Sequence, residues 1–252
     1  MKTEPNNVKI IAHRGGRDWA PENTLAAFRQ SLDIRVDGIE LDVQRCSTGE
    51  LVVFHDEDLS RTTNGVGLVA HSSLDEIKRL SAGRWFDRSY ADEKVPLLQE
   101  VLDLVDGKCV LHIEIKNTPI EYEGIEEELL ELLSGYVHRD KVVVSSFDHP
   151  LLARLHALDP ALDLGLLVDG ILIDLPAYAA RIGCKYFHPC ISESRTDTIE
   201  AAIAAGMRVN SWTVNGLREW RMAMDMGIEG IITDDPLGLA EALGRVQVSH
   251  AD

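Results

Sequence analysis

Two apolar stretches of the chain carry polar residues at every second position. They are Ile39-Glu40-Leu41-Asp42-Val43 and Leu111-His112-Ile113-Glu114-Ile115-Lys116. Residues two apart in a strand point to the same face, so the polar residues of each stretch share a face. In a parallel barrel both faces of a strand are covered, and carboxylates gathered there repel one another unless a cation lies between them. The pattern therefore predicts a metal site.

Glu40, Asp42 and Glu114 are the predicted ligands of that site. Carboxylate oxygens suit hard divalent cations, so we expect one Mg²⁺ or Ca²⁺ ion, with Mn²⁺ also possible. The residues alone leave an alternative open, in which Glu114 and Lys116 form a buried ion-pair network with Arg14. Burying such a network costs desolvation energy.

Two histidines and two cationic side chains suggest phosphoryl-transfer chemistry. His13 and His55 are candidate proton-transfer groups, because histidine both donates and accepts a proton near neutral pH; a structural, hydrogen-bonded histidine is the alternative for each. Arg14 and Lys116 supply the positive charge that a phosphate requires. Trp212 either packs against the carbon skeleton of the substrate or fills the barrel. Acid–base groups, cations and a metal are together typical of phosphate-ester chemistry.

The elements that must position these residues alternate along the 252-residue chain. Apolar stretches predict strands at Val8–Ala12, Gly38–Val43 continued by Leu51–Phe54, Val110–Ile115, Val142–Ser145, Leu164–Val168, Tyr186–His188, Val209–Thr213 and Gly230–Thr233. Amphipathic stretches predict helices at Asn23–Leu32, Leu97–Val105, Ile125–Leu133, Pro150–Leu158, Ile171–Ile182, Thr196–Ala205, Gly216–Met226 and Pro236–Leu243.

About eight strand–helix units in a chain of this length indicate an α/β fold, the TIM (β/α)₈ barrel. A doubly wound open sheet is the alternative, but the first strand is followed by His13-Arg14-Gly15-Gly16 and not by a dinucleotide-binding G-x-G-x-x-G. In a barrel the active site forms at the carboxyl ends of the strands, where the candidate residues lie. His112 is expected deeper in its strand, and His188 could belong to the site or to the strand end.

Residues of about 56–95 interrupt the alternation. The segment contains a short predicted helix, Leu74–Leu80, and the aromatic residues Trp85, Phe86 and Tyr90. It is too long for an ordinary loop, so we interpret it as a small insertion after the second strand, within a single domain of residues 1–252. It either covers the substrate or forms a peripheral cap.

Composition limits the partners of this protein. The net charge of −17 argues against nucleic-acid binding and against stable association with anionic membranes. The first seven residues are polar and lack the apolar run of a secretion signal, so we expect a cytoplasmic location. The sequence does not indicate an oligomeric state.

Several motifs resemble the glycerophosphodiester phosphodiesterase family and follow one another in the family's order over nearly the whole chain. They are His13-Arg14-Gly15, Pro21-Glu22-Asn23-Thr24, Glu40-Leu41-Asp42-Val43, His55-Asp56, Glu114-Ile115-Lys116, Ser146-Phe147, Trp212-Thr213-Val214-Asn215 and Gly230-Ile231-Ile232-Thr233-Asp234-Asp235-Pro236. One departure is Leu97, which replaces a threonine of the family pattern and removes a helix-capping side chain.

The resemblance implies a TIM barrel that hydrolyses a glycerophosphodiester to glycerol 3-phosphate and an alcohol. It also implies that the glycerol 2-hydroxyl attacks first and gives a cyclic phosphate, which water then opens. The roles implied are acid and base for His13 and His55, metal ligands for Glu40, Asp42 and Glu114, phosphate contacts for Arg14 and Lys116, and orientation of Arg14 for Glu22.

Two other functions remain open from the sequence. A lysophospholipid could replace the small glycerophosphodiester as substrate if an apolar groove, such as one formed by Trp85, Phe86 and Tyr90, accommodated its acyl chain. The chain could also be a non-catalytic barrel that binds metal or phosphate, although the complete set of chemical residues argues against it.

Overall fold

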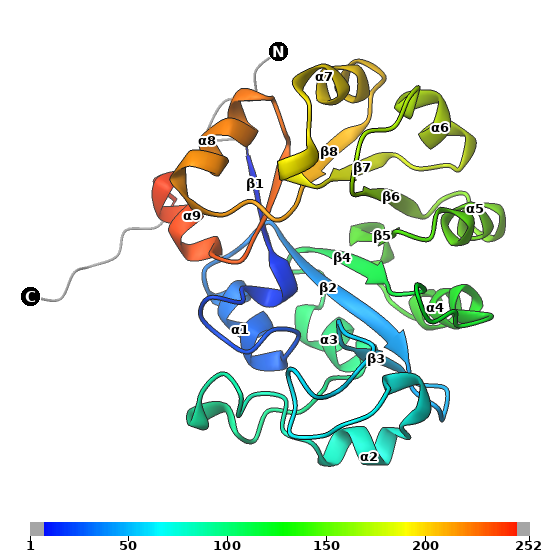
Figure 1. The fold of residues 1–252 in the computed structure, drawn as a ribbon, viewed down its shortest axis with the longest axis vertical. Helices are drawn as coiled ribbons and strands as arrows, with labels where there is room; N and C mark the ends of the chain where they lie inside the picture. The colour runs from blue at the N-terminus through cyan, green and yellow to red at the C-terminus, as the bar shows by residue number, and fades with distance from the viewer. Residues whose placement is uncertain (1–7, 246–252) are drawn as a thin grey trace, which may run out of the picture.

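The computed structural model describes residues 8–245, and eight parallel strands in it close into a barrel (Figure 1). The barrel strands are β1 Lys9–Ala12, β2 Gly38–Arg45, β4 Val110–Ile115, β5 Val142–Ser146, β6 Asp163–Val168, β7 Tyr186–Pro189, β8 Arg208–Ser211 and β9 Gly230–Thr233. Closure comes from β1, which pairs with β2 on one side and with β9 on the other. The predicted TIM barrel is therefore confirmed.

Nine α-helices lie in the described part of the chain, and most of them form a ring outside the strands (Figure 1). They are α1 Leu25–Asp33, α2 Leu74–Arg79, α3 Leu98–Val105, α4 Ile125–Ser134, α5 His149–Leu158, α6 Leu175–Arg181, α7 Thr196–Ala204, α8 Gly216–Asp225 and α9 Pro236–Ala242. The main hydrophobic core lies between this ring and the strands. Strands covered on both faces explain the nearly continuous apolar stretches.

The strand register places the charged residues of β2 and β4 side by side. Glu40 lies opposite His112. Asp42 lies opposite Glu114, two residues nearer the carboxyl ends of the strands. Since alternate residues point to one face, these four side chains share the interior of the barrel. The pair nearer the carboxyl end, Asp42 and Glu114, lies nearer the expected site.

The expectation that Leu51–Phe54 continues the second strand is wrong. Leu51–Val53 forms a separate strand, β3, which turns back and pairs antiparallel with β2. The backbone N–H of Phe54 donates to the carbonyl of Asp42. The hairpin thus returns His55 to the level of Asp42, where the prediction required it.

Helix α6 begins later than predicted, at Leu175 instead of Ile171. Asp174, its N-cap, has a φ of 54°, and Pro176 occupies the first turn. A proline ring fits that turn because it needs no N–H donor there. Ile171 and Ile173 consequently lie in an exposed loop. At α3 the N-cap Leu97 has no capping side chain, but the Glu100 carboxylate accepts from its backbone N–H.

The segment between β3 and α3 has its own small hydrophobic cluster, which packs on the outside of β3. Its buried members are Cys46, Val52, Phe54, Leu59, Val69, Ile77, Ala82 and Val95. The predicted short helix is present as α2, at the edge of the molecule (Figure 1).

None of the described helices is both long and apolar enough to cross a lipid bilayer. The predicted absence of a secretion signal concerns residues 1–7, which lie outside the described residues.

Candidate active site

A pocket of about 170 Å³ lies at the carboxyl ends of the barrel strands. Seven of the eight residues predicted from the sequence line it, namely His13, Arg14, Glu40, His55, Glu114, Lys116 and Trp212. The eighth, Asp42, is 1% exposed. Its carboxylate lies within 4.0 Å of the side-chain nitrogens of Arg14, His55 and Lys116. The structure therefore brings all eight together.

Glu40, Asp42 and Glu114 are buried, and each offers an oxygen within 4.8 Å of the other two. Burial raises the pKa of Glu40 well above its usual range, and the charges of Asp42 and Glu114 raise it further. Burial also pushes the pKa of Asp42 upward, but Arg14, His55 and Lys116 outweigh this effect and lower it. The three carboxylates together can bind a metal ion, which would relieve the repulsion around Glu40.

The cationic side chains neutralise this group only in part. Arg14 Nε lies 3.3 Å from Asp42 Oδ2, and Lys116 Nζ donates to Glu114 Oε1 at 2.7 Å. Lys116 Nζ also lies 3.9 Å from Asp42 Oδ1, so the ion-pair network considered as the alternative is present, with Asp42 linking Lys116 to Arg14. Two cations facing three carboxylates leave a deficit of one positive charge, so the donor set fits a divalent cation in addition to the network.

A strained turn positions Arg14 directly after β1. Its φ is 51°, a region that non-glycine residues seldom adopt. Its N–H donates to Glu40 Oε2 at 3.0 Å, and its carbonyl accepts from Asn23 at 2.9 Å. Gly15 follows with a φ of 84°, and a Cβ there would lie 2.8 Å from the side chain of Ala27. These contacts hold the strained backbone of Arg14 in place. Backbone strain of this kind is common at functional sites.

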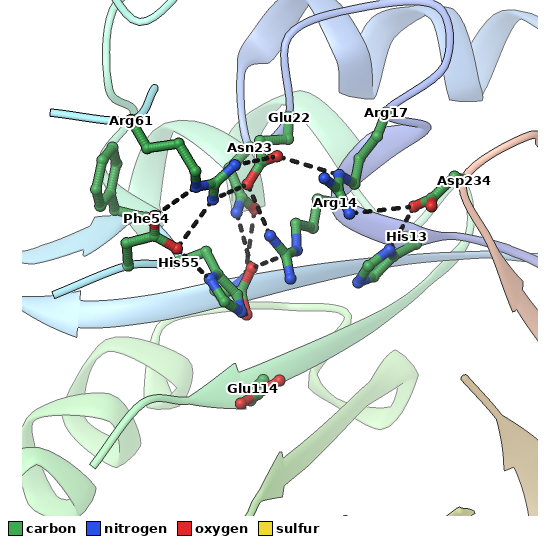
Figure 2. Close-up of polar contacts among 12 residues, drawn as sticks. His13, Arg14, Arg17, Glu22, Asn23, Phe54, His55, Arg61, Glu114 and Asp234 are labelled. Carbon is green, nitrogen blue, oxygen red and sulfur yellow. Dashed lines mark hydrogen bonds and ion pairs between the residues drawn. The ribbon is translucent and has the colours of Figure 1, made fainter. Parts of the chain in front are cut away.

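Asp234 orients His13. The Nδ1 of His13 lies 2.5 Å from Asp234 Oδ1, and its Nε2 lies 4.0 Å from Glu40 Oε2. Burial lowers the pKa of His13, while the hydrogen bond to Asp234 opposes that shift. With Nδ1 bound to the carboxylate, Nε2 is the ring nitrogen left for chemistry (Figure 2).

His55 has the same arrangement with its chain neighbour. Its Nδ1 lies 2.6 Å from Asp56 Oδ1, and its Nε2 lies 3.3 Å from Lys116 Nζ. The site thus contains two His–Asp pairs, one after β1 and one after β3.

An apolar wall completes the pocket. The rings of Phe147 and Trp212 meet edge to face with centroids 5.5 Å apart, and Trp212 Nε1 donates to the His188 carbonyl at 2.8 Å. His188 lines the pocket but is 1% exposed, and burial lowers its pKa to about 3. His112 lies deeper, at a centroid distance of 5.6 Å from His188, as the sequence predicted.

The aromatic residues of the 56–95 segment do not line this pocket. Trp85, Phe86 and Tyr90 pack edge to face on one another, and the Tyr90 hydroxyl bonds to residues of the α1 region. The part of the segment that approaches the site is Arg61, which binds both Asp56 and Glu22.

The predicted set of site residues omitted several that contact the site, among them Asn23, Asp234, Arg17 and Arg61. Asn23, which donates to Asp42 Oδ2 at 2.8 Å, belongs to a motif quoted above, so its position was a usable signal. Asp234 directly follows the predicted strand Gly230–Thr233, but nothing in the sequence pairs it with His13. Arg17 and Arg61 carry no periodic or spacing signal.

Comparison with known proteins connects this geometry to a family. The model of the glycerophosphoryl diester phosphodiesterase family matches residues 13–237. The chain belongs to this family. A glycerophosphodiester phosphodiesterase of Caldanaerobacter subterraneus is 40% identical over 228 residues, which cover 90% of this chain and 94% of the relative. One from Bacillus altitudinis is 39% identical over 91% of this chain and 95% of the relative.

Solved structures give the same family. A phosphodiesterase of Oleispira antarctica, in complex with the product sn-glycerol-3-phosphate, has a TM-score of 0.87 at 30% identity and covers 94% of this chain and 96% of its own. The structure of a family member from Silicibacter pomeroyi has a TM-score of 0.86 at 28% identity, covering 96% and 95%. As a member of the family, the protein is an enzyme.

Proposed function

We propose that this enzyme hydrolyses glycerophosphodiesters, the deacylated headgroups of phospholipids, to sn-glycerol 3-phosphate and an alcohol, with His13 and His55 as acid and base. The observation that carries the proposal is the convergence of two His–Asp pairs, a carboxylate triad and two cations in one pocket. The glycerol 3-phosphate bound by the relative from Oleispira antarctica supports the choice of substrate class.

Glu40, Asp42 and Glu114 would hold one divalent cation, Mg²⁺ or Ca²⁺, with Mn²⁺ possible. The bound cation would supply Lewis-acid stabilisation of the charge on the phosphoryl oxygens. Arg14 and Lys116 bind the remaining phosphoryl charge from the sides of the pocket. Phe147 and Trp212 offer an apolar surface to the glycerol carbons.

Proton transfer uses the Nε2 atoms of the two histidines. One histidine accepts the proton of the glycerol 2-hydroxyl as its oxygen forms a bond to phosphorus, and the other donates a proton to the departing alcohol oxygen. The nucleophile belongs to the substrate, so this step benefits from proximity. Water then opens the cyclic phosphate with the two proton transfers reversed, and both histidines return to their starting states.

We further propose that residues 1–252 form one domain, in which 56–95 is an insertion after the second barrel strand. The continuity of the main core around the whole barrel supports this division.

The decisive experiment measures glycerol 3-phosphate release from glycerophosphocholine and glycerophosphoethanolamine. The protein is stripped with EDTA, and Mg²⁺, Ca²⁺ or Mn²⁺ is restored separately. Activity that returns only with metal, and is lost in His13→Ala and His55→Ala, is the expected result. A folded protein that is inactive with every metal would overturn the proposal. Release of choline from lysophosphatidylcholine alone would replace it with the lysophospholipid substrate.

A further inference from the structure

Five charged side chains of alternating sign connect the two histidines along one side of the site, and one of the five, Arg17, also lines the pocket (Figure 2). In spatial order they are Asp234, Arg17, Glu22, Arg61 and Asp56. Their positions in the sequence give no hint of this order, because they come from the turn after β1, the insertion and the turn after β9.

The first half of the series runs through Arg17. Its Nη1 lies 3.8 Å from Asp234 Oδ1, the oxygen that binds His13. Its Nε lies 3.1 Å from Glu22 Oε2. Arg17 therefore connects the carboxylate that orients His13 to Glu22.

The second half runs through Arg61 and is bonded more densely. Arg61 Nη1 and Nη2 donate to the two oxygens of Glu22 at 3.0 and 2.8 Å. Its Nη2 also donates to Asp56 Oδ1 at 2.9 Å, and its Nε donates to Oδ2 of the same residue. Asp56 is the carboxylate that orients His55.

Glu22 is the centre of the series. It is 4% exposed and contacts the guanidinium groups of Arg14, Arg17 and Arg61. A buried carboxylate with three cationic partners has little freedom to move, so it can fix the positions of all three.

We propose that Arg17 and Arg61 are positioning residues that fix the two histidines relative to one another, by tying Asp234 and Asp56 to the single carboxylate of Glu22. The inference rests on the proposed acid–base roles of His13 and His55. It gives the 56–95 segment a part in the site through Arg61, although none of that segment's residues lines the pocket.

Contacts with the carboxylates distinguish this role from phosphate binding. Arg61 does not line the pocket, and its side-chain hydrogen bonds go to Glu22 and Asp56. Arg17 lines the pocket, but its guanidinium lies against the carboxylates of Glu22 and Asp234. Arg14 and Lys116 line the pocket and remain available to the phosphate. Loss of Arg17 or Arg61 should therefore slow turnover and leave ligand affinity nearly unchanged.

The test compares Arg17→Ala, Arg61→Ala and the matched control Arg84→Ala, an exposed arginine of the insertion whose guanidinium has no ion pair to any described residue. We expect kcat to fall about 10-fold without Arg17 and about 100-fold without Arg61, because misplaced catalytic groups cost up to this much. KM, and the affinity for glycerol 3-phosphate measured by calorimetry, should change less than threefold.

Two further measurements separate positioning from general stability. Arg61→Lys should recover little activity relative to Arg61→Ala, because an ammonium cannot bridge two carboxylates as a guanidinium fork does. Added guanidinium ion should restore part of the kcat of Arg61→Ala. If an alanine variant does not fold, its lysine counterpart is measured in its place, and a lysine variant with wild-type kcat overturns the inference.

A spectroscopic readout keeps the inference independent of turnover. In the wild type, the hydrogen-bonded Nδ1 protons of His13 and His55 should give downfield NMR signals. Arg17→Ala should shift or broaden that of His13, and Arg61→Ala that of His55. If the variants change the NMR signals as expected but the wild type has no activity, the proposed function is wrong and the positioning inference stands. Unchanged signals and unchanged kcat defeat the inference, and so does a raised KM with unchanged kcat, which would make the arginine a substrate contact.

Discussion

His13 and Asp234 lie 221 residues apart in the chain, yet their side chains meet at 2.5 Å. The contact follows from the pairing of β1 with β9, in which Ala12 lies opposite Thr233. Each member of the pair is the first residue after its strand. Closure of the barrel therefore creates the hydrogen bond.

Asp234→Asn tests what this contact does. The amide keeps the size of the carboxylate but cannot stabilise a protonated imidazole, and it can bind the wrong tautomer. We expect kcat to fall about 100- to 10,000-fold with little change in KM, measured as glycerol 3-phosphate release. A variant with wild-type kcat would leave Asp234 a structural role only.

Asn23→Gly tests the support of the carboxylate triad. Glycine tolerates the left-handed φ of 57° at this position and removes the amide that donates to Asp42. Groups that orient metal ligands typically contribute about 10- to 100-fold to affinity. We expect calorimetry to show a loss of that size for the divalent cation, and an unchanged affinity would show that Asp42 needs no such support.

Trp212→Ala tests the apolar wall. Loss of the ring would remove the proposed apolar contact with the glycerol carbons, so KM should rise about 10-fold while kcat changes less. Trp212→Phe keeps an aromatic face but loses the hydrogen bond to His188, and it should stay near the wild-type KM. Equal KM values for the two variants and the wild type would limit Trp212 to barrel packing.

Gly165→Ala tests how the barrel accommodates a buried histidine. A Cβ at this position would lie 2.7 Å from His188 Cε1, and both are enclosed by neighbouring strands. Overpacking of this kind costs about 1 to 3 kcal/mol of unfolding free energy, measurable by urea denaturation. Gly135→Ala is the matched control, because its nearest atom is 3.8 Å away. A stable Gly165→Ala would mean that His188 moves aside easily.

Glu22→Gln tests the pH dependence of stability. Burial alone would raise the pKa of Glu22, but the bonds from Arg61 and Arg14 outweigh it and lower the pKa. A lowered carboxyl pKa adds stability above the unfolded value of 4.5, and this is lost as the pH falls toward the folded pKa. Near pH 7 we expect the variant to be less stable by about 2 kcal/mol.

Urea denaturation of both proteins at lower pH tests the direction of the Glu22 pKa shift. The difference between wild type and Glu22→Gln should narrow below about pH 4.5 as Glu22 becomes protonated in the unfolded chain. A difference that widened on acidification would contradict the lowered pKa.

Much of the barrel could be predicted because each strand is covered on both faces and reads as an apolar stretch. Glu40, Asp42 and Glu114 could be found because carboxylates within such stretches need an explanation. The reversal of the chain at β3 could not be predicted, because a three-residue apolar stretch does not show whether a strand runs parallel or antiparallel to its neighbour. The helix predicted from Ile171 began too early, because the N-cap Asp174 and Pro176 start α6 only at Leu175.

The contacts around the histidines were beyond prediction for a different reason. Asp234, Arg17 and Arg61 meet only when distant strand ends converge on the same face of the barrel. No local pattern records such a meeting, and a charged residue in a turn is ordinary.

The pairing of β1 with β9 also has a consequence for protein synthesis. His13 leaves the ribosome early, whereas its partner carboxylate is added more than two hundred residues later. A nascent chain that has not yet made β9 lacks the His13–Asp234 hydrogen bond, whatever else has folded. Under the role proposed for His13, catalytic activity requires the last strand, and hydrolysis would report completed barrel closure.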